Sequence, residues 1–406
     1  MEINNTIIYL ITRPLIPPVD VLQAALPSLQ FSTFLAAIFS SSLADTLKTA
    51  ASTTLLIPQN SAFERLGLVT THLLLPASKA DLEKMILHHV VDEVVYLNAL
   101  QNGSQKTYGT LESSDVHVER AANGSVWVSP SGGWVGMRGS LVSGNTLTRT
   151  GVIHELSGVL LPRSVDITIG KLARAAKGNT MASLIVKAGM DWILNSTAPP
   201  EGTEWADAGL TGAQWTLLCP TDDSFTGVNM SRLWDDTTAL RRLVSQHLIP
   251  TPPTKGSNMV QTVAESSDPN RPIYFDGTAT YSTLLSHGSV YGDVVFRQAD
   301  SKNPQLGYLV GIKEARGTGA RNDWAKVLSW GRSTTGSGAG GIVQIDRILV
   351  PYQPAWWVEY GPPAAVGIVS IVLIAGFFWV VARIWRRETG EATYEPVGGF
   401  DREDDD

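Results

Sequence analysis

The residues that could act in catalysis or metal binding are one cysteine and a pair of adjacent histidines. Cys219 is the only cysteine in 406 residues, so an internal disulfide is excluded. A nucleophilic cysteine needs an accessible thiolate with a lowered pKa, usually beside a histidine. Cys219 lies on a predicted strand, and the aligned residue of a similar segment earlier in the chain is Ile57, which favours a buried structural thiol. An enzyme that uses this thiol remains the alternative.

The adjacent pair His88 and His89 invites a metal-binding interpretation, which its spacing opposes. Neighbouring residues on a helix project in different directions, so the two rings cannot share one ion by themselves. The glycine-rich stretch Gly331–Gly341 precedes an apolar strand, whereas phosphate-binding loops follow a strand and open a helix. The sequence has no G-x-S-x-G, H-E-x-x-H or EF-hand pattern. We therefore predict no catalytic residue, no metal site and no cofactor, and expect a protein that is not an enzyme.

Composition limits the classes of partner. The formal net charge is −7, acidic residues gather in the final DREDDD, and no basic run or basic-aromatic stripe is present. These features exclude the usual kind of nucleic-acid-binding protein. Hydrophobic residues make up 43% of the chain, which is enough to build packed cores without disulfides.

The elements that must position these residues come in a repeated order. TLLIPQNSAF at Thr54–Phe63 and TLLCPTDDSF at Thr216–Phe225 each combine an apolar strand, a proline, helix-capping polar residues and a phenylalanine. Cys219 corresponds to Ile57 in this alignment. Two further pairs follow in the same order: LHHVV at Leu87–Val91 with SQHLIP at Ser245–Pro250, and GVIHELSGVLLP at Gly151–Pro162 with GIVQIDRILVP at Gly341–Pro351. The chain is therefore predicted to be a tandem repeat.

Each repeat is predicted to mix helices with antiparallel strands. Apolar residues from Phe34 to Leu47 recur at helical spacing, and Ser78 with Asp81 is predicted to cap a helix that runs to His89. After Glu93 apolar residues alternate in twos, which is typical of strands with one buried face. The closing segments also alternate and end on proline, the pattern of a strand from which the chain leaves the sheet.

These segments resemble the fasciclin-like (FAS1) domain family. The family's first signature, T-x-x-x-P-[TS]-[ND]-x-A-F, is matched by Thr54, Pro58, Asn60, Ala62 and Phe63, and again by Thr216, Pro220, Thr221, Asp222 and Phe225. Ser224 stands where the family has alanine. The family's central Tyr-His pair corresponds to His88-His89 and Gln246-His247, so the histidine is kept and the tyrosine is replaced. The closing signature is matched well by the second repeat and more loosely by the first.

The resemblance implies an α+β fold of tandem twisted β-sandwich domains with packed helices. It implies one domain at residues 19–164, here called the first repeat, and another at 165–354, the second repeat, with insertions around Asn195–Gly212 and Asp300–Gly340. Residues 1–18 look like the closing strand of a preceding FAS1 unit. His89 and His247 are expected to make internal hydrogen bonds that fix a helix end against the sheet. Contact with a partner is the alternative, because this part of the fold is implicated in adhesion in family members.

One candidate transmembrane helix is predicted at residues 364–385, before an acidic tail at 386–406. The stretch Ala364–Ala382 contains no charge and no proline and is long enough to cross a hydrocarbon core of about 30 Å. Trp356, Trp357, Tyr360 and Trp385 flank it, as expected of residues at membrane interfaces. The prolines at 362 and 363 are expected to stand just before the helix.

Arginines give the predicted orientation. Arg383, Arg386 and Arg387 follow the apolar stretch, so the tail is expected in the cytosol and residues 1–360 in a lumenal or extracellular space, as in a type I single-pass protein. N-x-S/T triplets agree with a glycoprotein and begin at Asn4, Asn102, Asn123, Asn195 and Asn229. The start MEINNTIIYLITRP does not have the pattern of a signal peptide. Either the natural N-terminus lies upstream or the chain is tail-anchored with its bulk in the cytosol, and the arginines favour the first.

We therefore expect an adhesion or interaction protein, anchored in a lipid bilayer by one helix, that presents FAS1 surfaces to a protein, matrix or membrane partner. The motif set looks most like multi-FAS1 single-pass membrane proteins of fungi, some of them vacuolar. Tethering or trafficking at a vacuole-type membrane is one version of this hypothesis, and a cell-surface location is another.

Two alternatives remain open. One is a lumenal enzyme that uses Cys219 or a histidine. The other is a scavenger-type receptor, in which the segment from Tyr394 to Val397 would act as a sorting signal, because it has the Tyr-x-x-hydrophobic form read by traffic adaptors. A solvated acidic tail is the simpler interpretation of that segment.

Overall fold

The computed structural model divides the chain into two compact units, Met1–Pro351 and Tyr352–Asp406. It describes residues 2–3, 6–7, 9–207, 214–251, 270–275, 280–286, 291–299, 307–313, 324–335, 340–352 and 356–388. The first unit holds both repeats. The second holds the C-terminal helix.

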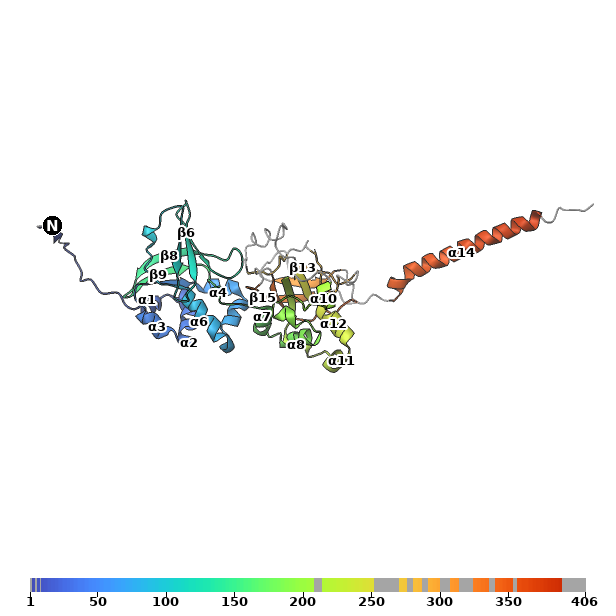
Figure 1. Cartoon of the computed structure of the whole chain (residues 1–406), viewed down its shortest axis with the longest axis horizontal. Helices are drawn as coiled ribbons and strands as arrows, with labels where there is room; N and C mark the ends of the chain where they lie inside the picture. Colours follow the sequence, from blue (N-terminus) through green and yellow to red (C-terminus); the bar gives the residue numbers. More distant parts are fainter. Residues whose placement is uncertain are drawn as a thin grey trace, which may run out of the picture. The chain divides into compact units, whose positions relative to one another are not determined.

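The first repeat combines strands with a layer of short helices (Figure 1). The strands are β3 (Thr53–Pro58), β4 (Val90–Val91), β5 (Ser104–Gly109), β6 (Asp115–Arg120), β7 (Val126–Pro130), β8 (Gly139–Leu147) and β9 (Gly151–Leu156). The α-helices are α1 (Val21–Ala25), α2 (Ser32–Ser40), α3 (Ala44–Thr49), α4 (Asn60–Leu66), α5 (Leu68–Leu73) and α6 (Lys79–His88).

The second repeat contains the same kinds of element. Its strands are β10 (Gln214–Pro220), β11 (Leu248–Thr251), β12 (Thr280–Tyr281), β13 (Val294–Gln298), β14 (Tyr308–Ile312), β15 (Trp324–Arg332) and β16 (Gly341–Ile345). Its helices are α7 (Ile169–Ala175), α8 (Asn179–Lys187), α9 (Asp191–Leu194), α10 (Glu204–Asp207), the 3₁₀ helix η5 (Asp222–Phe225), α11 (Met230–Asp235) and α12 (Thr237–Gln246).

The two seven-stranded sheets share one strand order. The first sheet runs β4-β3-β9-β8-β7-β6-β5 and the second runs β11-β10-β16-β15-β14-β13-β12. In each, the strand of the first signature pairs in parallel with the closing strand, β3 with β9 and β10 with β16. The other pairings are antiparallel. The predicted α+β class and tandem arrangement are confirmed.

The closing strands β9 and β16 are interior strands of their sheets. β9 and β16 come last in each repeat, yet they lie inside the sheet, between the first-signature strand and the antiparallel run. One face of β9 packs on the helical core through Ile153, and the other lines the interior of the sheet through Leu156, which explains why Val152 to Leu156 are buried without interruption. The proline that ends the motif marks where the chain leaves this interior position.

Each sheet curls on itself. The register of β8 against β9 and of β15 against β16 shifts at irregularities, and such bulges bend a strand and increase its twist. In the first repeat a bridge between Val91 and Thr110 brings the two ends of the sheet together. The resulting barrel-like interior is apolar and contains Leu56 of β3, Val116 of β6 and Val128 of β7.

The helical layers of the two repeats join in one apolar core. This core contains Phe34 and Leu68 of the first repeat together with Leu172 and Ile185 of the second. Burial of an aliphatic side chain contributes about 1.5–3 kcal/mol, so a shared core favours folding of the two repeats together. Residues Met1–Pro351 consequently behave as one compact unit.

The C-terminal unit consists of α14 (Trp356–Glu388). Its segment Pro363–Arg386 is 24 residues long, has a mean hydropathy of 2.6 and buries none of its surface inside the structure. The predicted apolar helix is confirmed, but α14 begins earlier than expected, so Pro362 and Pro363 lie within it and not before it. At 1.5 Å per residue the segment is long enough to cross a bilayer.

The N-terminal segment contains β1 (Glu2–Ile3), which pairs with β2 (Thr6–Ile7) in a small antiparallel hairpin. Beyond it the side chains of Tyr9, Leu10 and Leu15 are 79%, 93% and 85% exposed. The interpretation of residues 1–18 as the closing strand of another unit stays a prediction.

Candidate functional site

In the first repeat, His89, the histidine of the Tyr-His position, connects a helix to the segment that follows the closing strand, and this connection is here called the histidine joint. His89 follows α6 and is completely buried. Its Nδ1 donates to the carbonyl oxygen of Met85, one helical turn earlier, at 2.7 Å. Its Nε2 accepts the backbone N–H of Leu160, at 3.0 Å, from the segment that follows β9. One ring therefore connects the end of α6 to the closing segment.

The second repeat builds the same joint. His247 follows α12 and is also completely buried. Its Nδ1 donates to the carbonyl oxygen of Leu243 at 2.8 Å, and its Nε2 accepts the backbone N–H of Leu349 at 3.0 Å. The recurrence of both hydrogen bonds explains why this histidine is retained: a neutral imidazole supplies one donor and one acceptor at opposite ends of a rigid ring.

Both histidines are neutral at physiological pH. Burial lowers the pKa of His89 to about 3 and that of His247 to about 4. Both ring nitrogens of each histidine are already used, so neither ring is free for proton transfer or metal ligation. Among the described residues no group of His, Cys, Asp and Glu could hold a metal ion.

The residue before the joint differs between the repeats. His88 is completely buried, its Nδ1 lies 2.8 Å from Ser114 Oγ, and its Nε2 has no partner within the described part of the chain. Burial lowers its pKa to about 4. At the equivalent position Gln246 donates from Nε2 to the carbonyl oxygen of Gly292 at 2.7 Å. Both side chains are used in the interior, which leaves no exposed catalytic group at this position.

The first-signature residues hold each repeat together. Thr54 Oγ1 donates to Glu93 O at 2.7 Å and accepts from the Val95 N–H at 2.8 Å, whereas Thr216 Oγ1 is buried without a partner among the described residues. Pro58 and Pro220 end β3 and β10 opposite the closing strands. Phe63 and Phe225 lie in the helical core.

The polar signature residue caps a helix that is distant in sequence. Asn60 Oδ1 accepts the N–H of Thr33 at 2.9 Å, at the start of α2. Asp222 Oδ1 accepts the N–H of Thr180 at 2.7 Å, at the start of α8. The expectation that these polar residues cap the helix after the proline is wrong, because α4 and η5 have no side-chain cap. Asn60 and Asp222 instead accept N–H groups at the starts of α2 and α8, which come earlier in the chain than β3 and β10.

Cys219 is an interior residue. It is completely buried, and burial raises the pKa of its thiol to about 12. A Cβ placed on Gly178 would lie 2.1 Å from its sulfur, so the backbone packs directly on the thiol. A nucleophilic cysteine needs an accessible thiolate, and neither condition holds here.

Ser78 and Asp81 do not form the predicted cap of α6. Ser78 occupies the N-cap position but makes no side-chain capping bond, because its hydroxyl lies 3.2 Å from His72 Nδ1. Asp81 Oδ2 lies 3.1 Å from His72 Nε2 and 2.8 Å from Lys171 Nζ of the second repeat. Burial opposes ionisation of Asp81, yet the hydrogen bonds from Lys171 and His72 lower its pKa. This prediction was wrong because the carboxylate joins the two repeats.

Other residues that connect the two repeats belong to no motif recognised in the sequence. Asn270 donates to the carbonyl oxygen of Arg65 at 3.1 Å and accepts the Arg332 N–H at 3.2 Å. The Arg332 guanidinium lies 5.7 Å from the ring centroid of Trp134 in the first repeat. Gly67 has φ +52°, and a Cβ there would lie 2.5 Å from Trp330 O. The repeats therefore meet through hydrogen bonds, an ion pair and close backbone packing.

The candidate glycosylation residues within the described chain lie on the surface. Asn102, Asn123, Asn195 and Asn229 are all exposed. The side chain of Asn4 and the candidate sorting residues Tyr394 and Val397 lie outside the residues whose placement is described.

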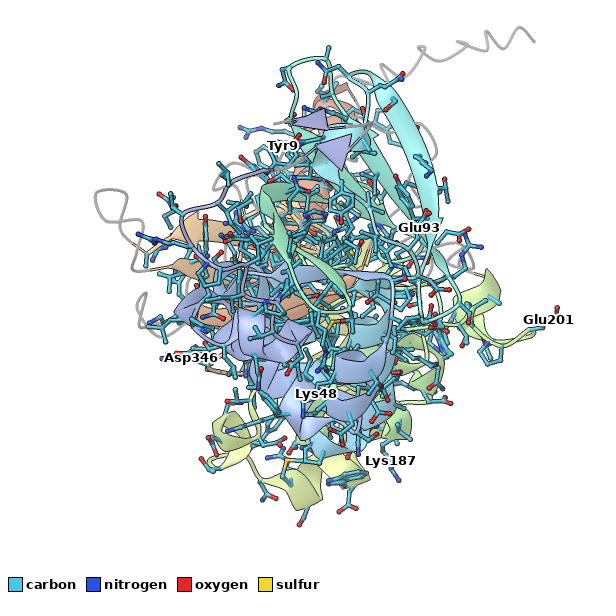
Figure 2. All side chains as sticks on the ribbon, turned by 90° about the vertical axis from the view of Figure 1, so that its left-hand side faces the viewer. Tyr9, Lys48, Glu93, Lys187, Glu201 and Asp346 are labelled. Carbon is cyan, nitrogen blue, oxygen red and sulfur yellow. The ribbon has the colours of Figure 1, made fainter. Side chains whose placement is uncertain are left out.

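Surface hollows among the described residues include the following two. One, of about 590 Å³, lies among α7, α8, α9 and α11 of the second repeat and includes Arg174, Lys187, Asn195 and Trp234. The other, of about 340 Å³, lies between residues 93–101 and the edge strand β5. Figure 2 shows two labelled residues of these hollows, Lys187 and Glu93, at the periphery of the molecule.

Comparisons with known proteins agree with the resemblance in the sequence. Residues 29–162 match the model of the family described as "Fasciclin domain". Human periostin is 29% identical over 252 residues, which is 61% of this chain and 26% of periostin, so the chain spans about a quarter of that relative's length. A FAS1 domain pair from the insect cell adhesion molecule fasciclin I is similar at 13% identity, covering 79% of this chain and 96% of that one, with a TM-score of 0.28. The family match supports a fasciclin domain at residues 29–162, and the second repeat shares the strand order of that domain.

Proposed function

We propose that this chain is a single-pass membrane protein that presents two fasciclin-type repeats, away from the cytosol, to a protein, matrix or membrane partner. The observation that carries the proposal is the combination of one apolar helix that is not buried inside the structure with two repeats in which Cys219, His89 and His247 are completely buried. Because these buried side chains are not available for catalysis, we expect the protein to act through contacts made by its surface. Tethering or trafficking at a vacuole-type membrane is one specific version of this proposal, and a cell-surface location is the other.

The orientation rests on the arginines beside α14. Arg383 and Arg386 lie at the C-terminal end of the segment Pro363–Arg386, and arginines are enriched on the cytosolic side of transmembrane helices. The exposed asparagines at 102, 123, 195 and 229 are compatible with a compartment in which sequons are modified.

The alternative of an enzyme that uses Cys219 or a histidine has little physical support. The Cys219 thiol has a raised pKa of about 12 and no access to solvent. His89 and His247 have both ring nitrogens engaged. Exchanging Cys219 for serine is expected to leave partner binding unchanged, and a loss of function with an unchanged fold would favour the enzyme.

Protease protection of sealed microsomes tests the topology. If the repeats are lumenal, added protease removes only the segment after α14 and shortens the chain slightly. Digestion of the repeats in intact vesicles would contradict the proposal and favour a tail-anchored protein with its bulk in the cytosol. Detergent-opened vesicles, in which the protease reaches all of the chain, are the control.

A clustering assay tests adhesion. Liposomes that carry the full chain are mixed with liposomes that carry it and with bare liposomes, and aggregation is followed by light scattering. Clustering with either population supports a homotypic or membrane partner, and clustering only after matrix proteins are added supports a matrix partner. Uptake of ligand by cells that depends on Tyr394 would favour the scavenger receptor instead.

A further inference from the structure

The hollow among α7, α8, α9 and α11 of the second repeat has the composition of a sugar-binding surface, and one of its own wall residues is a candidate glycosylation site. Leu194, Val186 and the half-buried Trp234 supply apolar surface, and Arg174, Lys187 and Asn179 supply hydrogen-bond donors. Sugars present both apolar C–H faces and hydroxyl groups, so a wall of mixed character suits them. Its volume of about 590 Å³ lies within the range of about 300–1,000 Å³ that is typical of sites for small-molecule ligands.

Asn195 belongs to the wall of this hollow and starts the triplet Asn195-Ser196-Thr197. Its side chain is exposed, and the side-chain amide has no hydrogen-bond partner among the described residues. The triplet is held in place at the end of α9. Ser196 has φ +56°, the Thr197 N–H donates to Trp192 O at 3.0 Å, and Ser196 Oγ accepts the Ile169 N–H at 3.3 Å. A group attached to Asn195 would therefore start from a fixed point on the rim.

We propose that Asn195 carries an N-linked glycan and that the hollow holds the first sugars of that glycan against Trp234. This inference rests on the lumenal orientation proposed above. The glycosidic bond forms between Asn195 Nδ2 and the anomeric carbon of an N-acetylglucosamine. The bond from that carbon to a phosphate oxygen of a polyprenyl-pyrophosphate oligosaccharide donor breaks, the pyrophosphate leaves with the electron pair, and Nδ2 loses one proton.

The charged side chains of the hollow suit the occupant. Lys187 Nζ lies 5.8 Å from the ring centroid of Trp234, and neither Lys187 nor Arg174 has a carboxylate partner within the described residues. The acetamido carbonyl and the hydroxyl oxygens of N-acetylglucosamine accept hydrogen bonds from such donors. The glycan would cover apolar surface that the second repeat otherwise leaves exposed, including Val186, which is 55% exposed.

Asn102 supplies the matched comparison. It begins Asn102-Gly103-Ser104 on a turn where Gly103 has φ +77° and no atom within 4 Å of a Cβ built on it. Asn102 is exposed and lines neither of the two hollows, so its side chain does not start from a hollow wall as Asn195 does. The two sites lie in one chain and share one biosynthetic route, so a difference between their glycans reports on the hollow.

The test uses the full chain made in a eukaryotic secretory host. Glycopeptide mass spectrometry first measures occupancy at each asparagine. An endoglycosidase that cleaves within the first two sugars is then applied to the native protein. We expect release at Asn195 to be about tenfold slower than at Asn102, which corresponds to about 1.4 kcal/mol of protection, and we expect denaturation to abolish the difference.

Two variants locate the protection. Trp234→Ala removes the aromatic wall, and Ser183→Trp fills the hollow from an exposed position on α8. Both should raise the release rate at Asn195 to that at Asn102, while Ser61→Trp, on an exposed position of α4, should change neither rate. An unmodified Asn195 beside a modified Asn102, or equal release rates in the native protein, would overturn the inference and leave the topology standing. A chain modified at no asparagine would overturn both.

Discussion

The hydroxyl groups of Thr54 and Thr216 occupy equivalent places in the two repeats and have different surroundings. Thr54 bridges Glu93 O and the Val95 N–H, whereas Thr216 Oγ1 is buried without a partner in the described residues. Removing one partner of a buried hydrogen bond leaves the other unsatisfied, which costs about 1–3 kcal/mol. We expect Thr54→Val to lower the free energy of unfolding of residues 1–351 by that amount in urea titrations. Thr216→Val, of the same shape, should be neutral or stabilising, and equal losses would contradict this account.

The buried histidines predict a dependence of stability on pH. Burial lowers the pKa of His88 to about 4, that of His89 to about 3 and that of His247 to about 4. Below about 6.5 the unfolded chain binds protons at these residues and the folded chain does not. Stability should therefore be fully present above pH 6.5 and fall as the pH drops toward 4. The matched variant is His88→Gln, because Gln246 occupies that position in the second repeat.

His88→Gln should reduce the loss of stability between pH 7 and pH 5 by about 2 kcal/mol, the contribution of one such histidine. Urea titrations of residues 1–351 at the two pH values measure it. The quantity compared is the change with pH within each variant, so a constant effect of the substitution on stability cancels. An identical pH dependence in both proteins would show that His88 is protonated equally in the folded and unfolded chains.

At the scale of elements, the capping of α2 and α8 gives a further prediction. Asn60 Oδ1 accepts the Thr33 N–H, and its Nδ2 donates to Leu29 O and to Ser32 Oγ, each at 3.0 Å. Loss of a helix cap costs about 0.5–2 kcal/mol. Asn60→Ala should lower stability by this amount, and Asn60→Asp should retain the part that depends on Oδ1, as Asp222 does in the second repeat. Thermal unfolding of the two variants distinguishes the cap from a general effect at the site.

The sequence predicted those elements whose signals are local. In each first signature the apolar strand, the proline and the polar residue lie within a few positions of one another. The tandem repeat and its α+β class could therefore be inferred from the sequence. Two features depend on partners that are distant in sequence. Asn60 Oδ1 accepts the N–H of Thr33, which lies 27 positions earlier, and β3 pairs with β9 across nearly the whole repeat. Asn270, which connects the repeats, sits in no motif at all.

The interface between the repeats depends on close approach of two backbones. Gly67 has φ +52°, which side chains rarely adopt, and a Cβ there would lie 2.5 Å from Trp330 O. Gly67→Ala should cost about 1–3 kcal/mol in backbone strain and open the contact between the repeats. Limited proteolysis near residue 165 should become faster, and unfolding should separate into two transitions. Gly109→Ala, where an added Cβ meets open space, is the control, and faster cleavage in both variants would show an effect of glycine loss alone.

At the scale of the whole molecule, anchoring of many copies in one membrane by α14 is expected to raise the apparent affinity of weak contacts. If the repeats bind a partner, many copies on one membrane act together, and linked sites can gain about 10²–10⁴ in apparent affinity without new contacts. Residues 1–351, which form a compact unit without α14, should therefore inhibit liposome clustering only when present in large excess over the anchored chain. The expected result is a graded loss of light scattering with rising concentration of residues 1–351. Gly67→Ala in the same fragment should inhibit less if the partner contacts both repeats, and equally if one repeat holds the whole binding surface. Clustering that no concentration of the fragment reduces would show that the contact is made by the helix or the tail and not by the repeats.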